Sequence, residues 1–417
     1  MTAPHPRSAH RRRRLTGRDP LESRRSATPL ELLYDLTIVV AFGTASNEMA
    51  HYIADDHVAA GIAGFAFAAF AVSWAWLNYS WFASAYDTDD WVFRLATMVQ
   101  MVGVVILALG LEQAFASIDH GPTLDNGVMV AGYVVMRSSM LFLWAQAARH
   151  DRGRARSARK YLLTIAVAQA GWVTLVFLDL SVAWSFAVAG VLLAIELAGP
   201  ALAERIEGGT PWHAGHIAER YGLLIIITLG EGIIGTVASL NALVHTEDGW
   251  TLDAALVTVA GVGLTFGCWW TYFAVPWEAA LRVRSRRQFA WSYGHIFMFA
   301  GLAAMGGGLH VAADLLEHEA KIGVVATVLS VAIPVAFYLG ALYAVYSIVM
   351  READPFHIGL LMGTAIVVVG SVALAAAGVA MPVCLVVLMF APIVTVIGYE
   401  LVGHRHMAQA LQRLNAG

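Results

Sequence analysis

The stretch HIAERYGLLIIITLGEGIIG, residues 216–235, decides the fold class because it combines a long aliphatic run with charge on both sides. Glu219 and Arg220 precede the run, and Glu231 follows it. At about 1.5 Å rise per helical residue, Glu231 lies roughly 18 Å beyond Glu219. A helix of this composition suits a lipid bilayer, and it would carry one carboxylate deep into the hydrocarbon.

The whole chain has the composition of a membrane protein. Of its 417 residues, 59% are hydrophobic and 13% are charged, and the mean hydropathy is +0.65. Soluble domains carry about 25% charged residues, so an ordinary soluble domain is excluded. Cys268 and Cys384 lie inside apolar runs, which predicts neither a disulfide framework nor a thiolate metal site. The first 29 residues are Arg-rich without an apolar core segment, so they are not a secretory signal peptide.

Apolar runs long enough to cross a core of about 30 Å predict an all-α membrane protein with about 12 transmembrane helices. The predicted spans are residues 30–51, 58–83, 92–116, 126–148, 160–179, 182–202, 217–240, 253–276, 289–312, 321–350, 357–379 and 382–402.

Lys and Arg gather in segments that fall on one side of the predicted membrane. These segments are HRRRRLTGRD and ESRR before the first span, RHDRGRARSARK after the fourth, and EAALRVRSRRQ after the eighth. The loops ADDHV, SIDHGPTLDNG and NALVHTEDGWTLD, on the opposite side, carry neither residue. Because Lys and Arg are enriched in cytoplasmic loops, we predict that both termini lie in the cytoplasm.

Two pairs of similar segments indicate an internal repeat. YDLTIVVAFG, residues 34–43, resembles YGLLIIITLG, residues 221–230, and YSWFASAYD, residues 79–87, resembles WTYFAVPWE, residues 270–278. The two pairs have nearly the same spacing, which predicts two six-helix halves related as a parallel repeat. The predicted divisions are a disordered basic tail at 1–29, halves at 30–202 and 203–402, and a cytoplasmic C-terminal tail at 403–417.

Ionisable side chains inside the spans are the candidate functional residues, because each costs at least ~2.5–3.5 kcal/mol in hydrocarbon. Arg137 keeps its proton and therefore needs a counter-ion or an anionic ligand. Glu231, Glu48 and Glu112 lie at comparable depth and are its candidate partners. Glu196 also lies within a span, in the inner half of the sixth. The sequence leaves open whether Arg137 forms a permanent ion pair between helices or belongs to a substrate or ion site.

Two further acidic residues also allow both a structural role and a role in a substrate or ion site. Glu231 shares one helix face with Thr228, Gly235 and Ser239, a small polar stripe that either packs closely or lines a pore. Asp35 is a candidate proton or cation site, although an acidic residue is also favoured at a helix N-terminus.

Other chemistry is weakly represented. His213 and His216 lack a third ligand at helical spacing, so no metal is predicted. The chain has no P-loop, dinucleotide fingerprint, nucleophile elbow or HExxH motif, and we expect neither a cofactor nor an enzyme.

The segment MGGGLH, residues 305–310, fits either a broken helix beside a cavity or tight packing. The basic tail fits anionic lipid headgroups or nucleic acid, but a topogenic tail facing the bilayer explains it without nucleic acid.

PLELLYDLTIVVAF, NYSWFASAYDTDDWVFR and HIAERYGLLIIITLGEGI resemble motifs of the bacterial low-temperature-requirement A family. Tyr34 and Tyr221 stand where phenylalanine is usual in that family. The resemblance implies a multi-pass protein of the bacterial cytoplasmic (inner) membrane that is linked to growth in the cold, and it implies no particular activity. The matching motif residues are Glu31, Tyr34, Asp35, Asn78, Asp87, His216, Glu219, Arg220, Tyr221, Gly222, Gly230 and Glu231.

These observations favour a secondary transporter or exporter of a small solute or ion, with or without proton coupling. Its charged centre would contain Glu231, Arg137, Glu48 and Asp35. The alternative is a non-transporting sensor or structural protein required for envelope function or growth in the cold, in which the charges only hold helices together. An intramembrane enzyme acting on lipid-linked substrates is disfavoured, because the sequence shows no nucleophile or metal constellation. The sequence gives no oligomeric state.

Overall fold

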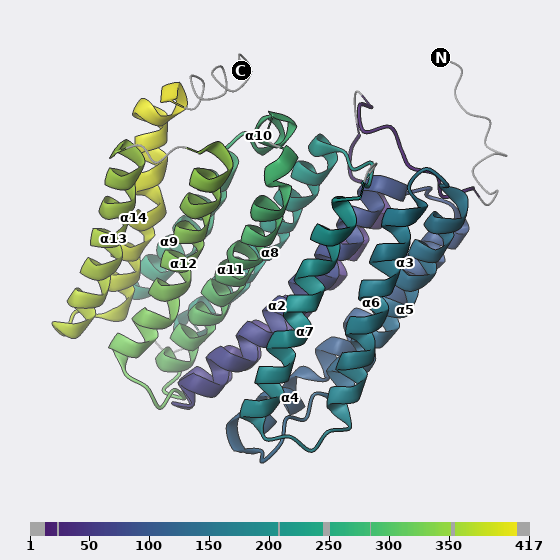
Figure 1. The fold of residues 1–417 in the computed structure, drawn as a ribbon. Helices are drawn as coiled ribbons and strands as arrows, with labels where there is room; N and C mark the ends of the chain where they lie inside the picture. The colour runs from purple at the N-terminus through teal and green to yellow at the C-terminus, as the bar shows by residue number, and fades with distance from the viewer. Residues whose placement is uncertain are drawn as a thin grey trace. The chain divides into compact units, whose positions relative to one another are not determined.

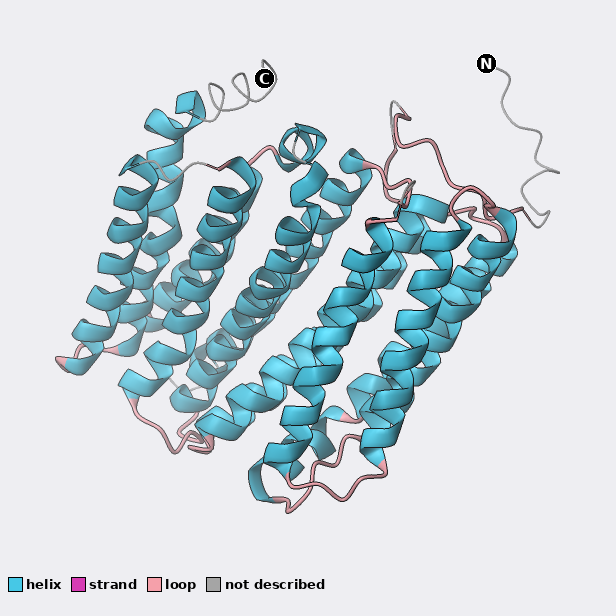
Figure 2. Cartoon of the chain, in the orientation of Figure 1, coloured by secondary structure: helices cyan, strands magenta, loops and turns pink. Residues whose placement is uncertain are grey.

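The computed structural model describes residues 13–22, 25–206, 209–244, 251–283, 285–351 and 355–406. In these residues the secondary structure is almost entirely helical, apart from an isolated β-bridge between Thr123 and Ser181 (Figure 2). The helices are α1 Pro29–Ala54, α2 Val58–Tyr86, α3 Trp91–Leu109, α4 Leu111–His120, α5 Gly127–His150, α6 Ala155–Val176, α7 Val182–Glu204, α8 Ala214–Val244, α9 Leu252–Phe273, α10 Trp277–Val283, α11 Gln288–Leu316, α12 Val324–Met350, α13 Pro355–Ala376 and α14 Met381–Gly398.

Within the described part of the chain, eleven helical segments are long and apolar enough to cross a membrane. The short helices α4 and α10 extend the segments that begin with α3 and α9. The remaining long helix, α6, has 22 residues, and Arg156, Arg159 and Lys160 make its first turns polar. The prediction of an all-α membrane protein with about 12 transmembrane helices is confirmed.

Contacts between residues divide the chain into two compact units. The first unit contains residues 1–41 and 74–217, and the second contains residues 42–73 and 218–417. In the first unit α3, α5, α6 and α7 pack in succession, and in the second unit α11, α12, α13 and α14 do so, with α9 beside α14. Figure 1 shows the long helices of each unit packed side by side. The parallel repeat and the divisions at residues 202 and 402 remain predictions.

Part of the predicted disordered tail instead packs on loops of the first unit. The Arg13 main-chain N–H donates to Asp90 Oδ2 at 2.7 Å, just before α3. The Leu15 N–H donates to His150 Nδ1 at 3.2 Å and the Gly17 N–H to Asp151 Oδ2 at 3.1 Å, both at the end of α5. Residues 1–12, 23, 24 and 407–417, from the two predicted tails, lie outside the described residues.

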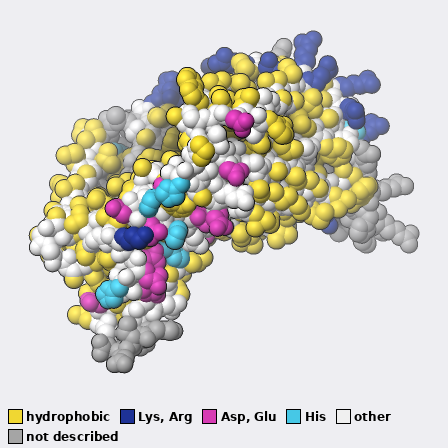
Figure 3. Space-filling model, turned by 90° about the horizontal axis from the view of Figure 1, so that it is seen from below, with side chains coloured by type: hydrophobic (Ala, Val, Ile, Leu, Met, Phe, Trp, Pro, Cys, Tyr) yellow, Lys and Arg dark blue, Asp and Glu magenta, His cyan; other side chains and the backbone are white. Residues whose placement is uncertain are grey.

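Acidic side chains are exposed in two loops of the second unit. Asp56 lies between α1 and α2, and Glu317 and Glu319 follow α11. The ammonium group of Lys321 lies 3.1 Å from a carboxylate oxygen of Asp55. Asp, Glu and His predominate among the charged side chains in the foreground of Figure 3, and Lys and Arg gather at its upper border. This segregation agrees with the predicted topology, and the orientation in the membrane remains a prediction.

The three glycines at 306–308 bring α11 close to three other helices of the second unit. A Cβ on the first glycine would lie 2.7 Å from the main-chain carbonyl carbon of Glu231 on α8. On the second, it would lie 2.8 Å from the carbonyl oxygen of Ser46 on α1, and the third lies against the main chain of Ser330 on α12. α11 is continuous through this segment, so tight packing, and not a broken helix, explains MGGGLH.

We predict that Gly306→Ala destabilises the protein, because its new methyl group would overlap the main chain of α8. Overpacking of this kind costs about 1–3 kcal/mol. Gly340→Ala on α12 is the matched control, since a Cβ there meets no atom within 4 Å. Thermal unfolding in detergent should show a lower midpoint for Gly306→Ala and an unchanged or higher midpoint for Gly340→Ala. Equal midpoints for the two variants would contradict the packing role of Gly306.

Candidate functional site

Arg137 forms a buried ion pair in the first unit. It lies on α5 with 1% of its surface exposed, and its Nη2 atom lies 2.6 Å from Oε2 of Glu196 on α7. Glu196 is 4% exposed. The sequence placed Glu196 inside a span but proposed Glu231, Glu48 or Glu112 as the partner of Arg137. The structure corrects that assignment, since Glu196 takes the ion pair.

Two more side chains complete this group, which we call the Arg137 cluster: Trp74, Tyr133, Arg137 and Glu196. The indole N–H of Trp74 donates to Glu196 Oε2 at 2.7 Å, and the Tyr133 hydroxyl donates to Glu196 Oε1 at 2.9 Å. Arg137 also donates to the Tyr133 hydroxyl, and its Cζ atom lies 4.7 Å from the Tyr133 ring centroid. Three donors therefore converge on the Glu196 carboxylate, joining α2, α5 and α7.

The ion pair does not use all the hydrogen-bonding capacity of Arg137. Its Nε and Nη1 atoms are buried and have no hydrogen-bond partner among the described residues. A buried donor left unpaired costs about 1–3 kcal/mol. The Arg137 cluster thus combines a carboxylate that accepts three hydrogen bonds with a guanidinium that still has donors to offer.

Glu231 presents the opposite situation in the second unit. It lies on α8 with 5% of its surface exposed, and no hydrogen bond or ion pair to its carboxylate is found in the described part of the chain. The carboxylate lies against α1, where a Cβ on Gly43 would be 2.8 Å from its Oε1 atom. One turn earlier on α8, the buried Thr228 hydroxyl also lacks a partner among the described residues.

The remainder of the small polar stripe on α8 serves helix packing. A Cβ on Gly235 would lie 2.6 Å from the carbonyl oxygen of Gly306, and the Ser239 hydroxyl donates to the Leu309 carbonyl at 2.7 Å. Both contacts are with α11. The stripe therefore divides into a packed outer part and the pair Thr228 and Glu231, whose polar atoms are not used by the protein.

The acidic residues at the start of α1 are engaged by the first unit. Glu31 and Thr28 form a capping box, in which the Thr28 N–H donates to Glu31 Oε2 at 2.8 Å and the Glu31 N–H to Thr28 Oγ1 at 3.3 Å. His216 Nε2 lies 3.2 Å from the same carboxylate oxygen of Glu31. Asp35 accepts a hydrogen bond from the Trp76 indole at 2.6 Å. These contacts favour a structural role for both acids.

The other predicted ion partners lie in different settings. Glu112 is exposed in the first turn of α4, and Glu48 on α1 is half-buried. The motif residue Asn78 donates to the Trp74 carbonyl at 2.8 Å, which is an intrahelical contact.

The aromatic and charged motif residues are mostly buried. The Tyr34 ring packs on Tyr79 with centroids 4.2 Å apart, and the Tyr221 hydroxyl hydrogen-bonds that of Ser292. Arg220 is fully buried, whereas Glu219 is exposed.

The two motif glycines differ in their surroundings. A Cβ on Gly222 would approach the Phe273 ring to 3.2 Å, whereas one on Gly230 would meet no atom within 4 Å.

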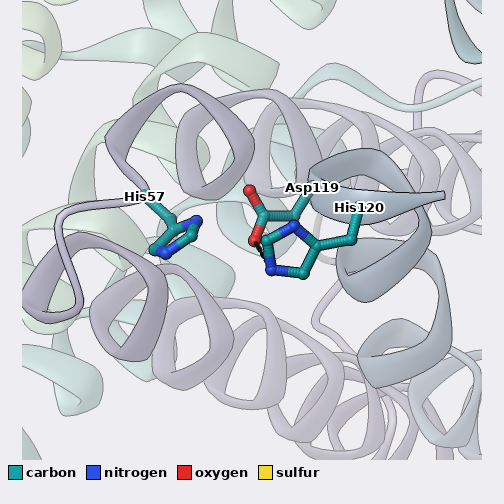
Figure 4. A group of neighbouring side chains, drawn as sticks. All are labelled: His57, Asp119 and His120. Atoms are coloured by element: carbon teal, nitrogen blue, oxygen red, sulfur yellow. Dashed lines mark ion pairs between the residues drawn. The ribbon is translucent and has the colours of Figure 1, made fainter.

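His213 and His216 each contact other protein atoms. His213 Nδ1 accepts the His216 main-chain N–H at 3.0 Å, and His213 Nε2 lies 2.8 Å from the carbonyl oxygen of Glu22. At the end of α4, the Asp119 carboxylate and the exposed His120 imidazole lie 2.9 Å apart (Figure 4). Figure 4 also draws His57, which precedes α2 in the second unit. None of these three residues is among the candidates predicted from the sequence.

Asp87 is a buried acid beyond the end of α2, next to the N-terminal segment. Burial and the nearby charge of Glu31 raise its pKa from 3.8 to about 6, although Arg25 and Arg18 oppose this shift. Arg18 Nη1 lies 3.8 Å from Asp87 Oδ2. Burial also lowers the pKa of Arg25 to about 10, and its guanidinium donates to main-chain carbonyls at the end of α2.

Comparison with known proteins agrees with these motifs. Residues 26–392 match the family described as bacterial low temperature requirement A protein. The chain belongs to this family. The low temperature requirement A match spans both units and includes all of the motif residues named above.

An uncharacterized protein of Rhizobium meliloti (strain 1021) is 26% identical over 353 residues, covering 79% of this chain and 80% of that protein. No solved structure matches the chain.

Variants of the Arg137 ion pair should show strong coupling. Arg137→Met or Glu196→Gln leaves a buried charge unpaired, and each should cost about 3–5 kcal/mol of stability. The double variant Arg137→Met/Glu196→Gln should cost clearly less than the sum. Urea unfolding in mixed micelles measures the four proteins. The exposed pair Glu278 and Arg282 is the control, with an expected coupling of about 0.3–0.5 kcal/mol. Additive costs at Arg137 and Glu196 would exclude a stabilising pair.

Asp87 should make stability depend on pH. Its pKa is higher in the folded protein, about 6, than its ordinary 3.8, so the folded state binds more protons between these values. The contribution of Asp87 to the free energy of unfolding is therefore largest below pH 4, and it falls by about 3 kcal/mol as the pH rises past 6. Asp87→Asn should reduce the change in the thermal unfolding midpoint between pH 4 and pH 6. The exposed Asp125→Asn should leave that change as it is in the wild type. An unchanged slope in Asp87→Asn would rule out this effect.

Proposed function

We propose that the protein is a secondary transporter or exporter of a small solute or ion, coupled to protons through Glu231. The observation that carries this proposal is the Glu231 carboxylate, which has no hydrogen bond or ion pair in the described part of the chain although the residue is only 5% exposed. A carboxylate in a membrane-spanning helix must be protonated, bind a cation or face water, since an isolated buried charge is very costly. Binding and releasing a proton is what a coupling site requires.

The surroundings of Glu231 support its assignment to a proton or cation site. Gly43 leaves room for its carboxylate, and Gly306 brings α11 against its main chain. The unpartnered Thr228 hydroxyl lies one turn away on the same face. A carboxylate and a hydroxyl on one rigid helix face provide oxygen atoms for a proton, a hydrated proton or a small cation.

The architecture is consistent with transport. The succession α3, α5, α6, α7 in the first unit has a counterpart in α11, α12, α13, α14 in the second, as expected for a parallel repeat. The Lys- and Arg-rich connections support an inner-membrane protein with both termini in the cytoplasm. In this proposal the protein has no catalytic activity, and its partners are the lipid bilayer and an unidentified small solute or ion.

The alternative is a non-transporting structural or sensory protein needed in the cold. The contacts of Glu31, Asp35 and Glu196 favour it, because each of these buried acids accepts hydrogen bonds from the protein. Glu231 is the residue on which the two proposals differ.

Proton flux into proteoliposomes should distinguish the two. Vesicles contain the pH-sensitive dye pyranine, a potassium diffusion potential drives proton entry, and a bacterial polar-metabolite extract is added outside. We expect extract-stimulated flux with the wild type and at least a tenfold loss in Glu231→Gln. Glu112→Gln, an exposed carboxylate on α4, should retain wild-type flux. Flux equal to that of protein-free vesicles would contradict transport, and wild-type flux in Glu231→Gln would remove Glu231 from the mechanism.

A further inference from the structure

The first unit contains a second set of unused polar atoms, on α6, the helix that packs against the Arg137-bearing α5. Gln169 on α6 is 8% exposed, and neither its Oε1 nor its Nε2 atom has a hydrogen-bond partner among the described residues. Buried amides normally find partners, so an amide with both atoms unused needs an explanation. On Arg137, Nε and Nη1 are unused as well.

Two aromatic pairs fix the register between α5 and α6 and place these atoms at one level. Trp144 stacks on Tyr161 with centroids 4.1 Å apart, and Tyr133 contacts Trp172 edge-on at 6.4 Å. In both pairs the two residue numbers have the same sum, as an antiparallel helix pair requires. That register places Arg137 opposite residue 168, one position from Gln169. Gln169 also lies one turn from Trp172, on the face of α6 that meets α5.

The unused atoms are mainly donors. Arg137 Nε carries one N–H and Nη1 carries two, and the Gln169 amide adds two more against a single acceptor oxygen. The nearby Glu196 carboxylate does not bond to these donors, since its hydrogen bonds come from Trp74, Tyr133 and Nη2 of Arg137. A ligand that fits this set must bring acceptor oxygens, and the guanidinium favours negatively charged ones.

Charge balance adds a condition. Arg137 and Glu196 together are neutral, so an anion entering between α5 and α6 would leave one negative charge uncompensated in the membrane. Among the described residues, Arg137 and Tyr133 of α5 are the titratable groups that contact the Glu196 carboxylate. The neighbouring helix α2 contributes the uncharged indole of Trp74. Protonation of Glu196 restores neutrality and frees Arg137 for the anion.

We propose that the first unit binds a small carboxylate between α5 and α6, through Arg137 and Gln169, with uptake of one proton by Glu196. This names the substrate class of the proposed transporter and rests on that function, but binding is measured without transport. Arg137 and Gln169 contact the carboxylate oxygens. Tyr133 and Trp74 hold the Glu196 side chain while it takes the proton.

Calorimetric titration of the purified full-length protein in detergent with acetate tests the binding. Affinity should rise by up to about tenfold per unit fall in pH, as the uptake of one proton requires. Titrations in two buffers with different ionisation enthalpies should report one proton per acetate. Absence of acetate binding, or binding of inorganic phosphate alone, would overturn the proposal, as would affinity independent of pH.

Gln169→Leu is the decisive variant, because it removes an amide that the protein itself does not use. Its unfolding midpoint should be unchanged or higher, while acetate affinity falls at least tenfold. Gln146→Leu is the matched control, a buried glutamine on α5 about 13 Å from Arg137 along the helix axis. It should bind acetate like the wild type. Wild-type affinity in Gln169→Leu would show that Gln169 is not a ligand.

Arg137→Lys and Glu196→Gln complete the test. Arg137→Lys should weaken acetate binding, and Glu196→Gln should abolish its dependence on pH; retained wild-type behaviour in either contradicts the assigned role. The outcomes also separate the two proposals. Acetate binding without any metabolite-stimulated proton flux would contradict transport alone. Flux without acetate binding would contradict the carboxylate site alone.

Discussion

The cost of a charge in hydrocarbon is the constraint on which the rest of this structure depends. Arg137 cannot lose its proton, so the chain must supply a counter-ion at the same depth. It does so with Glu196, and the hydrogen bonds from Trp74 and Tyr133 then fix the carboxylate. One buried charge thereby determines which faces of α2, α5 and α7 turn toward each other.

Glu231 is treated differently, and the difference comes from backbone packing. Around it the second unit provides glycines in place of donors: Gly43 beside the carboxylate and Gly306 against the main chain of α8. Glycine permits close approach but offers no side chain to neutralise a charge. The fold therefore packs closely around Glu231 without compensating it, whereas Arg137 is compensated but retains unused donors. Close packing without full compensation is the property expected of a group that exchanges protons or ligands.

The spans were predictable because hydropathy is a local property of about 20 residues, and each predicted span corresponds to a helical segment in the structure. The partner of Arg137 could not be predicted in the same way, because ion pairing depends on which helix faces meet in the folded protein. Glu196 was recognised as an intramembrane acid, but depth alone ranked Glu231, Glu48 and Glu112 above it. The predicted six-helix halves separate Arg137 from Glu231 but not from Glu48 and Glu112, so the repeat narrows the choice of partner without deciding it. The packing of residues 13–22 on the first unit was also not predicted, because it uses main-chain N–H donors, which every residue type except proline provides.

The Arg137 cluster also shows why an ion pair should not be counted as structural on the strength of its short distance. The Glu196 carboxylate already accepts hydrogen bonds from three donors and carries a negative charge, so an anionic ligand must address the guanidinium. The guanidinium meets Glu196 through Nη2 alone, which leaves the Nε and Nη1 donors directed elsewhere. A pair selected only for stability would gain from a second hydrogen bond or from apolar replacement. The protein instead keeps a charged Arg137 that meets Glu196 at one atom, and an unused amide on the facing helix. A site that binds and releases an anion explains this arrangement better.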